Sequence, residues 1–194
     1  MTKNKVNNVV HMPIQKAFPG MFKDIEIEWS KPMIYDEFMK KHPSHDKNSC
    51  FYMLTGKYSD YPYKLFYIGR TYNNSSRIPN QRDEEIVYDQ IFRRLRQPDH
   101  KKRYEQLKKE YPHHTLYVGV GTVYYDKDIT PELIDKIETI LIFSHFDYEK
   151  NRYMLNKKKV YSYYFGNDQF CVTNRRHRGP LYKEISHGIF VKGK

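Results

Sequence analysis

The stretch at residues 49–70, SCFYMLTGKYSDYPYKLFYIGR, decides the fold. Two apolar segments rich in aromatic residues, 51–54 and 65–70, flank a polar stretch that contains a proline. Short apolar runs separated by turn residues are typical of paired strands. We therefore predict a β-hairpin with a longer loop, in which Tyr52 lies on the first strand and Tyr67 on the second.

Downstream of the hairpin, the sequence predicts helices on both sides of a further strand. Apolar residues recur at helical spacing in 84–96, and a second, basic helical stretch follows at 101–110. Segment 115–124 is β-like and is expected to add a third strand to the hairpin. The clearest helix begins at Thr130, because proline and glutamate follow it as the N1 and first-turn residues, and it should run through Ile142.

The length of the chain, 194 residues, suits one domain with a substantial core. Residues 1–47 are polar and interrupted by prolines, so they are predicted to form an N-terminal arm. The core should span 48–160. The mixed β-like and basic segment 161–194 is expected to be a C-terminal extension packed on that core.

The charge of the chain suggests a polyanionic partner. Lys and Arg number 34 against 23 Asp and Glu, which gives a formal net charge of +11. Such an excess concentrates polyanions at the protein surface, so nucleic acid is the first candidate, and a basic surface with no particular ligand is the alternative.

No apolar run is long enough to span a membrane, and the polar start 1–5 lacks the apolar stretch of a secretion signal. We therefore expect a cytoplasmic protein without membrane association. The two cysteines, Cys50 and Cys171, lie far apart and predict neither a disulfide framework nor a zinc site.

Two charged residues fall on the inward flanks of predicted helices. At about 100° per residue, Glu138 lies beside the apolar stripe of its helix, and a partly desolvated carboxylate there requires a partner. It is a candidate metal ligand, and an ion pair with a neighbouring Lys or Arg is the alternative. Arg94 lies at the edge of the stripe in the earlier helix, where it can either reach into a cleft or extend to solvent.

The two tyrosines of the hairpin are candidates for acid–base chemistry. A free phenol titrates near pH ~10, so a tyrosine base needs a nearby cation or a metal-bound water. Arg70, three residues after Tyr67, is a candidate for that cation. The alternative for Tyr52 and Tyr67 is that both are ordinary aromatic residues of a core.

Taken in chain order, these elements resemble the GIY-YIG nucleases, most closely the stand-alone restriction-type or phage-borne members. The resemblance covers residues 49–156. The matching elements are Cys50-Phe51-Tyr52, Tyr67-Ile68-Gly69, Arg94-Leu95, Ile137-Glu138-Thr139-Ile140-Leu141-Ile142 and a downstream asparagine, either Asn156 or Asn151. Some relatives place a histidine one turn after the arginine; Pro98 stands there in this chain, which leaves His100 as a substitute.

The resemblance implies an α/β (α+β) fold, a small three-stranded antiparallel sheet flanked by helices, with N- and C-terminal extensions. It implies a metal-dependent endonuclease in which Glu138 ligates Mg²⁺ or Mn²⁺ and Arg94 stabilises the phosphorane-like charge. Tyr52 or Tyr67 activates or orients the water. We favour Tyr52 as the base and Tyr67 as the orienting residue, and the assignment stays open.

The partner implied by the resemblance is double-stranded DNA in a bacterial cell. Two basic clusters are predicted to contact phosphates, and a solvated surface is the alternative: Lys157, Lys158 and Lys159, and then Arg175, Arg176 and Arg178. A homodimer is expected if both strands are cut, because each chain carries one site. The competing functions are a catalytically silent DNA-binding or nuclease-antagonist protein, and an RNA-directed or repair-type nuclease.

Overall fold

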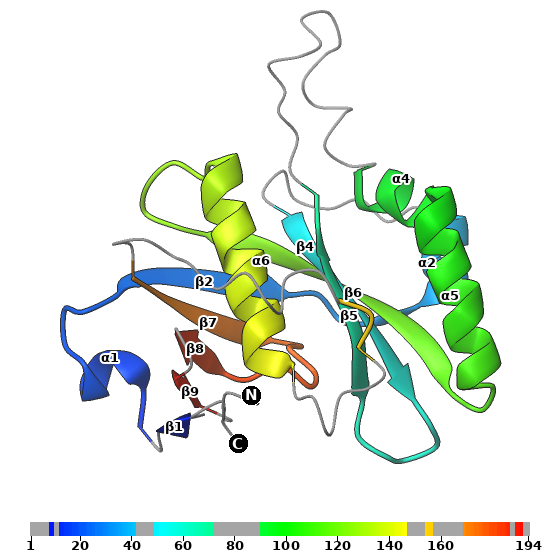
Figure 1. Cartoon of the computed structure of the whole chain (residues 1–194), viewed down its shortest axis with the longest axis horizontal. Helices are drawn as coiled ribbons and strands as arrows, with labels where there is room; N and C mark the ends of the chain where they lie inside the picture. The colour runs from blue at the N-terminus through cyan, green and yellow to red at the C-terminus, as the bar shows by residue number, and fades with distance from the viewer. Residues whose placement is uncertain are drawn as a thin grey trace, which may run out of the picture.

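The computed structural model of the chain describes residues 8–9, 12–41, 49–71, 90–146, 154–156, 169–186 and 189–191 (Figure 1). Its strands are β1 (Asn8–Val9), β2 (Lys23–Trp29), β3 (Met33–Ile34), β4 (Ser49–Lys57), β5 (Lys64–Arg70), β6 (Thr115–Tyr124), β7 (Phe170–Arg176), β8 (Glu184–Ser186) and β9 (Ile189–Val191). Its helices are α1 (Ile14–Ala17), α2 (Tyr35–Lys41), α4 (Gln90–Arg96), α5 (Pro98–Glu110) and α6 (Pro131–His145).

The described strands form a single mixed sheet of nine strands in the order β1-β9-β8-β7-β2-β6-β4-β5, with β3 also paired to β6. Strand β2 runs parallel to β7, and β1 runs parallel to β9; the other pairs are antiparallel. The prediction of a small three-stranded antiparallel sheet is therefore wrong. Strands β4, β5 and β6 pair as expected, but β6 continues the sheet by pairing with β2 on its other edge.

Strand β2 lies inside the sheet, although its residues belong to the segment predicted to be an arm. Its sequence KDIEIEW alternates, and Ile25, Ile27 and Trp29 are almost completely buried. Both edges are paired, because β7 bonds it on one side and β6 on the other. The sheet consequently extends across both predicted domain boundaries, after residues 47 and 160.

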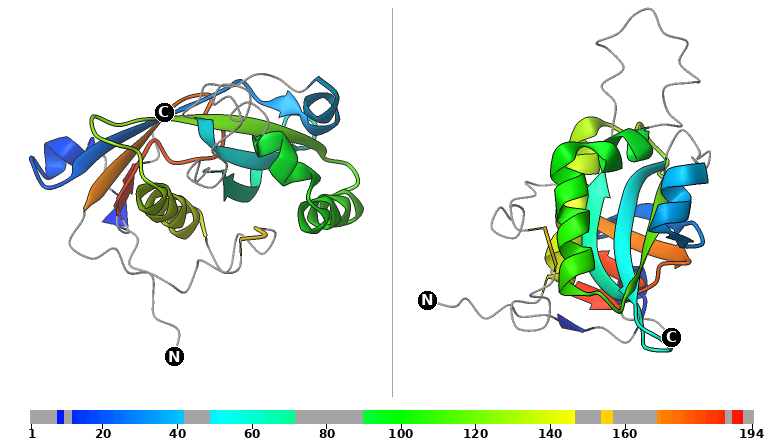
Figure 2. Two further views of the ribbon diagram at one scale, coloured as in Figure 1. Left: turned by 90° about the horizontal axis from the view of Figure 1, so that it is seen from above. Right: turned by 90° about the vertical axis from the view of Figure 1, so that its right-hand side faces the viewer.

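Two hydrophobic cores cover the two faces of the sheet. Phe51 and Met53 of β4 belong to the core under α6, whereas Tyr52 and Leu54 belong to the core under α2, α4 and α5. This alternation follows from the two-residue period of a strand, and burial of both faces explains why β4 is apolar at successive positions. Figures 1 and 2 show β5 between α6 and the pair α4 and α5.

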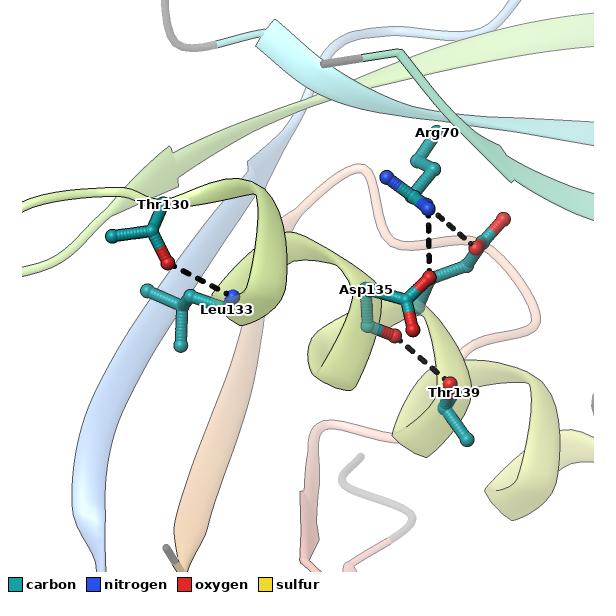
Figure 3. Close-up of polar contacts among 6 residues, drawn as sticks. Arg70, Thr130, Leu133, Asp135 and Thr139 are labelled. Carbon is teal, nitrogen blue, oxygen red and sulfur yellow. Dashed lines mark hydrogen bonds and ion pairs between the residues drawn. The ribbon is translucent and has the colours of Figure 1, made fainter. Parts of the chain in front are cut away.

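The helix signals in the sequence act as expected at α6 and differently at α5. Thr130 caps α6 by accepting a hydrogen bond from the Leu133 amide at 3.2 Å, and the helix runs to His145 (Figure 3). Pro98 ends α4 but also starts α5, three residues before the predicted stretch, because a proline at N1 lacks only an amide that a helix leaves unpaired. None of the described helices has both the length and the apolar character needed to cross a membrane.

Candidate active site

Tyr52 and Tyr67 come together on adjacent strands. Their ring centroids lie 5.8 Å apart with the planes tilted by 36°. Gly69 pairs with Tyr52 across the hairpin, and a Cβ atom there would collide with the Tyr52 ring and lie 2.6 Å from Cε1 of Tyr67. The glycine of the Tyr-Ile-Gly element is thus required sterically, because the Tyr52 ring crosses over its Cα.

Burial controls the ionisation of both phenols. Tyr52 is fully buried, and burial raises the pKa of its hydroxyl well above the ordinary value, with a further increase from Tyr67 and Glu138 and a decrease from Arg94. Burial, followed by Glu138, also raises the pKa of Tyr67, while Arg103 and Arg94 oppose the shift. Both phenols are therefore protonated at neutral pH.

His100 of α5 completes this aromatic cluster. Its ring lies edge-on to Tyr67 at a centroid distance of 5.6 Å and 6.3 Å from Tyr52. Burial and the charge of Arg94 lower the pKa of His100 to about 4, so the imidazole is neutral at physiological pH. Nε2 lies 3.7 Å from an Asp99 carboxylate oxygen, beyond hydrogen-bonding distance, and no other described residue bonds it.

Two arginines supply positive charge to the cluster. Arg94 is partly buried, donates a hydrogen bond to Gln97 and lowers the pKa values of Tyr52, Tyr67 and His100. The Cζ atom of Arg103 lies 5.7 Å from the centroid of the Tyr67 ring, within cation–π range. Arg103 was not among the residues predicted from the sequence. It lies three residues after His100, and this helical spacing, which places both on the same face of α5, could have identified it.

Glu138 enters the site from α6 and is held by Arg70, which Figure 3 shows beside Asp135 of the same helix. The Arg70 Nε atom donates to Oε2 of Glu138 at 3.0 Å, and its NH2 group donates to Oδ1 of Asp135 at 2.7 Å. Glu138 is 7% exposed. The ion-pair interpretation of Glu138 is thus realised. Arg70 binds two carboxylates, so the prediction that it is the cation beside Tyr67 has no support from the described contacts.

The site lies on both faces of β5, the strand at the end of the sheet order. Tyr52, Tyr67 and His100 lie on the α4–α5 face, whereas Arg70 points to α6 on the other face. The carboxylate of Glu138 is nonetheless close enough to raise the pKa of both phenols. Arg94 and Glu138 thus each act electrostatically on both Tyr52 and Tyr67.

Carboxylates for a metal ion are available at one place in the site. The described residues contain no group of three or more His, Cys, Asp or Glu side chains placed to hold a metal. Mg²⁺, however, binds through one or two carboxylates, several waters and substrate phosphates. Glu138 and Asp135, which share Arg70, fit a site of this type in which the substrate supplies further ligands.

The side chain of Asn156 hydrogen-bonds to the backbone of β5. Its Oδ1 atom accepts a hydrogen bond from the Ile68 amide at 2.8 Å, and its Nδ2 group donates to the Ile68 carbonyl at 2.6 Å. The amide of the preceding residue, Leu155, donates to the Phe66 carbonyl at 2.8 Å. The segment 154–156 therefore pairs with β5 on the side away from β4. The alternative asparagine, Asn151, lies outside the described residues.

The predicted phosphate-binding residues of β7 and the turn after it already have partners. Arg175 pairs with Glu26 at 2.5 Å and Arg176 with Glu28 at 2.7 Å, across the parallel strands β7 and β2. Arg178 donates a hydrogen bond to the Leu181 carbonyl. A phosphate would have to compete with two carboxylates at this surface. The other cluster, Lys157, Lys158 and Lys159, lies outside the described residues.

Comparisons of the chain with protein-family models, with curated proteins and with solved structures found no match.

Proposed function

We propose that the protein is a metal-dependent endonuclease of the GIY-YIG type that hydrolyses phosphodiester bonds of double-stranded DNA in the cytoplasm. The observation that supports this function is the arrangement around β5: Tyr52, Tyr67 and His100 cluster on one face, where Arg94 lowers the pKa of all three, and Glu138 is held on the other face by Arg70 of the same strand.

Positive charge is the first requirement for phosphodiester hydrolysis, since negative charge grows on the phosphoryl oxygens. Glu138, with Asp135 beside it, would hold Mg²⁺ or Mn²⁺, and the bound ion would supply charge and a more acidic water. Arg94 would contact the phosphoryl oxygens. Arg70 acts as a positioning residue, because its bonds fix the carboxylate of Glu138 on α6 relative to β5.

Orientation of the attacking water is the second requirement. The raised pKa values mean that each tyrosine begins as a neutral phenol that donates a hydrogen bond. Tyr67 is 8% exposed and Tyr52 is 0% exposed, so we assign the water-facing role to Tyr67 and a supporting role to Tyr52. This reverses the preference drawn from the sequence. Arg94 and Arg103 favour the phenolate that a general base requires, and Glu138 opposes it.

The test is cleavage of plasmid DNA and of end-labelled duplexes with Mg²⁺ or Mn²⁺, followed by mapping of the ends. We expect Glu138→Gln to lower the rate about 10²- to 10³-fold, in the range of a lost transition-state contact. Glu132→Gln is the matched control on the exposed first turn of α6 and should cleave normally. Absence of metal-dependent cleavage by the unmodified protein, or equal cleavage by Glu138→Gln, would reject the proposal.

A catalytically silent DNA-binding or nuclease-antagonist protein is the second candidate. The observation in its favour is that Arg70 already neutralises both carboxylates available to a metal. This candidate predicts salt-sensitive DNA binding that is the same in EDTA and in Mg²⁺, without cleavage. Arg70→Ala separates the two functions, because a nuclease should lose activity when Glu138 is no longer positioned, whereas a silent binder should keep its affinity.

A further inference from the structure

A separate aromatic pocket lies at the tip of the β4–β5 hairpin, the lower end of these strands in Figure 1. Its volume of about 600 Å³ is within the range of about 300–1,000 Å³ common for ligand sites. Its lining includes Tyr58, Tyr61, Tyr63, Lys64 and His114. None of Tyr52, Tyr67, Arg94, His100 and Glu138 lines the pocket, although Leu65, which does, lies two residues before Tyr67 on β5. The pocket is therefore not part of the catalytic cluster.

The hairpin loop holds two exposed tyrosines in a fixed arrangement. The Tyr61 amide donates to the Tyr58 carbonyl at 3.1 Å, and Ser59 between them has a φ of 48°, in the left-handed region. The two rings stack at a centroid distance of 5.9 Å with an interplanar angle of 17°. Tyr58 is 46% and Tyr61 66% exposed. Because the turn fixes the pair before binding, a flat ligand would stack on it at little conformational cost.

Charge and hydrogen bonding restrict the chemistry of that ligand. Lys64 lines the pocket, and Lys57 Nζ lies 5.7 Å from the centroid of the Tyr63 ring, so a cation such as a methylated lysine is disfavoured and an anion is favoured. His114 also lines the pocket, and its Nδ1 atom is buried without a hydrogen-bond partner among the described residues. Burial and Lys64 lower the pKa of His114, which keeps the ring neutral. A flat, anionic ligand with hydrogen-bonding edges fits these walls.

We propose that this pocket binds an unpaired nucleotide of a DNA strand, with its base stacked on Tyr58 and Tyr61, its phosphate beside Lys64 and its base edge near His114. Only the choice of DNA over other nucleotide sources rests on the proposed nuclease function. Because Lys64 and Tyr67 lie on the same strand, β5, a DNA strand bound in the pocket would lie close to the catalytic cluster. A single-stranded end or flap would thereby be bound at a defined distance from the site of cleavage.

Fluorescence titration of a short single-stranded oligodeoxynucleotide that contains 2-aminopurine tests the proposal. Stacking on Tyr58 and Tyr61 should quench the probe, and Tyr61→Ala should weaken binding about tenfold, whereas Tyr61→Phe should retain it. Tyr124→Ala is the matched control, since Tyr124 is 47% exposed on β6 and does not line the pocket. Circular dichroism should show the same fold for all variants. Equal affinity of Tyr61→Ala and the unmodified protein overturns the proposal.

Competitors define the ligand. Thymidine monophosphate that displaces the probe as well as an equal concentration of oligonucleotide would assign the pocket to free nucleotides and overturn the DNA-strand assignment. A blunt, fully paired duplex that binds with the same dependence on Tyr61 would overturn the requirement for an unpaired nucleotide. Binding of a trimethyllysine peptide without binding of the oligonucleotide would replace the proposal with a cation site.

The two proposals fail separately. Tyr61→Ala should weaken probe binding by the same factor in the Glu138→Gln background as in the unmodified protein, because Glu138 does not line the pocket. Tyr61-dependent binding without any cleavage would reject the nuclease and retain the pocket. Cleavage that requires Glu138, together with probe binding that is independent of Tyr61, would reject the pocket and retain the nuclease.

Discussion

Replacement of Asn156 by alanine should destabilise the fold without removing a group that acts on the substrate. The side-chain amide satisfies both the N–H and the C=O of Ile68, at 2.8 and 2.6 Å. Loss of a partner leaves a buried backbone group unsatisfied at a cost of about 1–3 kcal/mol. Because β5 ends the strand order of the sheet, water can partly replace the lost hydrogen bonds to Ile68. We expect the variant to lose about 2–3 kcal/mol of unfolding free energy for the two groups together.

Urea unfolding monitored by tryptophan fluorescence measures this loss. The chain contains one tryptophan, Trp29, which is fully buried on β2 and donates to Oδ1 of Asn174 at 2.9 Å. With a slope of about 2 kcal/mol per molar urea, the midpoint should fall by about 1–1.5 M. Gln106→Ala is the matched control, because it removes an exposed amide that bonds Glu110, and its midpoint should hardly move.

Two outcomes would contradict the structural role of Asn156. An Asn156→Ala variant that unfolds within about 0.5 kcal/mol of the unmodified protein would show that the two bonds to Ile68 are replaced at no cost. A variant that keeps full stability but no longer cleaves DNA would show instead that Asn156 acts in catalysis and not in holding β5. Asn156→Asp should fall between the two, since it keeps an acceptor for the Ile68 amide but loses the donor to the carbonyl.

Three further outcomes are expected. Gly69→Ala should lower the unfolding free energy, measured in urea, by about 1–3 kcal/mol, because its Cβ meets the Tyr52 ring. The loss should exceed that of Gly119→Ala, whose Cβ meets the flexible side chain of Met53. Equal losses would contradict this explanation. His100 has a folded-state pKa of about 4, below its ordinary 6.5, so the unfolded state takes up the proton first as the pH falls. Stability should therefore drop by up to roughly 3 kcal/mol between pH 6.5 and 4, a drop that His100→Gln should remove. At the β7 surface, Arg176→Gln should reduce the slope of log K against log salt concentration for DNA binding by about 0.9. Glu28→Gln removes the carboxylate that competes for Arg176 and should raise the affinity for DNA. An unchanged slope in Arg176→Gln would exclude a phosphate contact.

The local features of the site could be predicted from the sequence. The hairpin and the start of α6 follow from turn residues and a threonine N-cap, and both are confirmed. Helical spacing also identified Glu138 as a buried carboxylate in need of a partner. These predictions depend on residues within about one or two turns of each other, and that is the range over which periodicity carries information.

The long-range features could not be predicted in the same way. The partner of Glu138 is Arg70, 68 residues earlier, and no local pattern distinguishes it from the other cations of this basic chain. The alternation of Ile25, Ile27 and Trp29 is typical of a strand, although this segment was predicted to belong to an arm. Its place between β6 and β7, however, is set by pairings with residues far along the chain, which a hydrophobic pattern does not specify.

The central position of β2 has a consequence for how the chain folds. Residues 23–29 are synthesised early, yet their two neighbours in the sheet, 115–124 and 170–176, are synthesised late. Pairings between such distant segments close slowly, because a long loop must be ordered before any contact forms. Until β7 arrives, the apolar residues of β2 lie next to an unpaired strand edge, which favours association between nascent chains. We therefore expect the yield of native protein to depend on temperature and chain concentration during synthesis more strongly than the stability of the finished sheet would suggest.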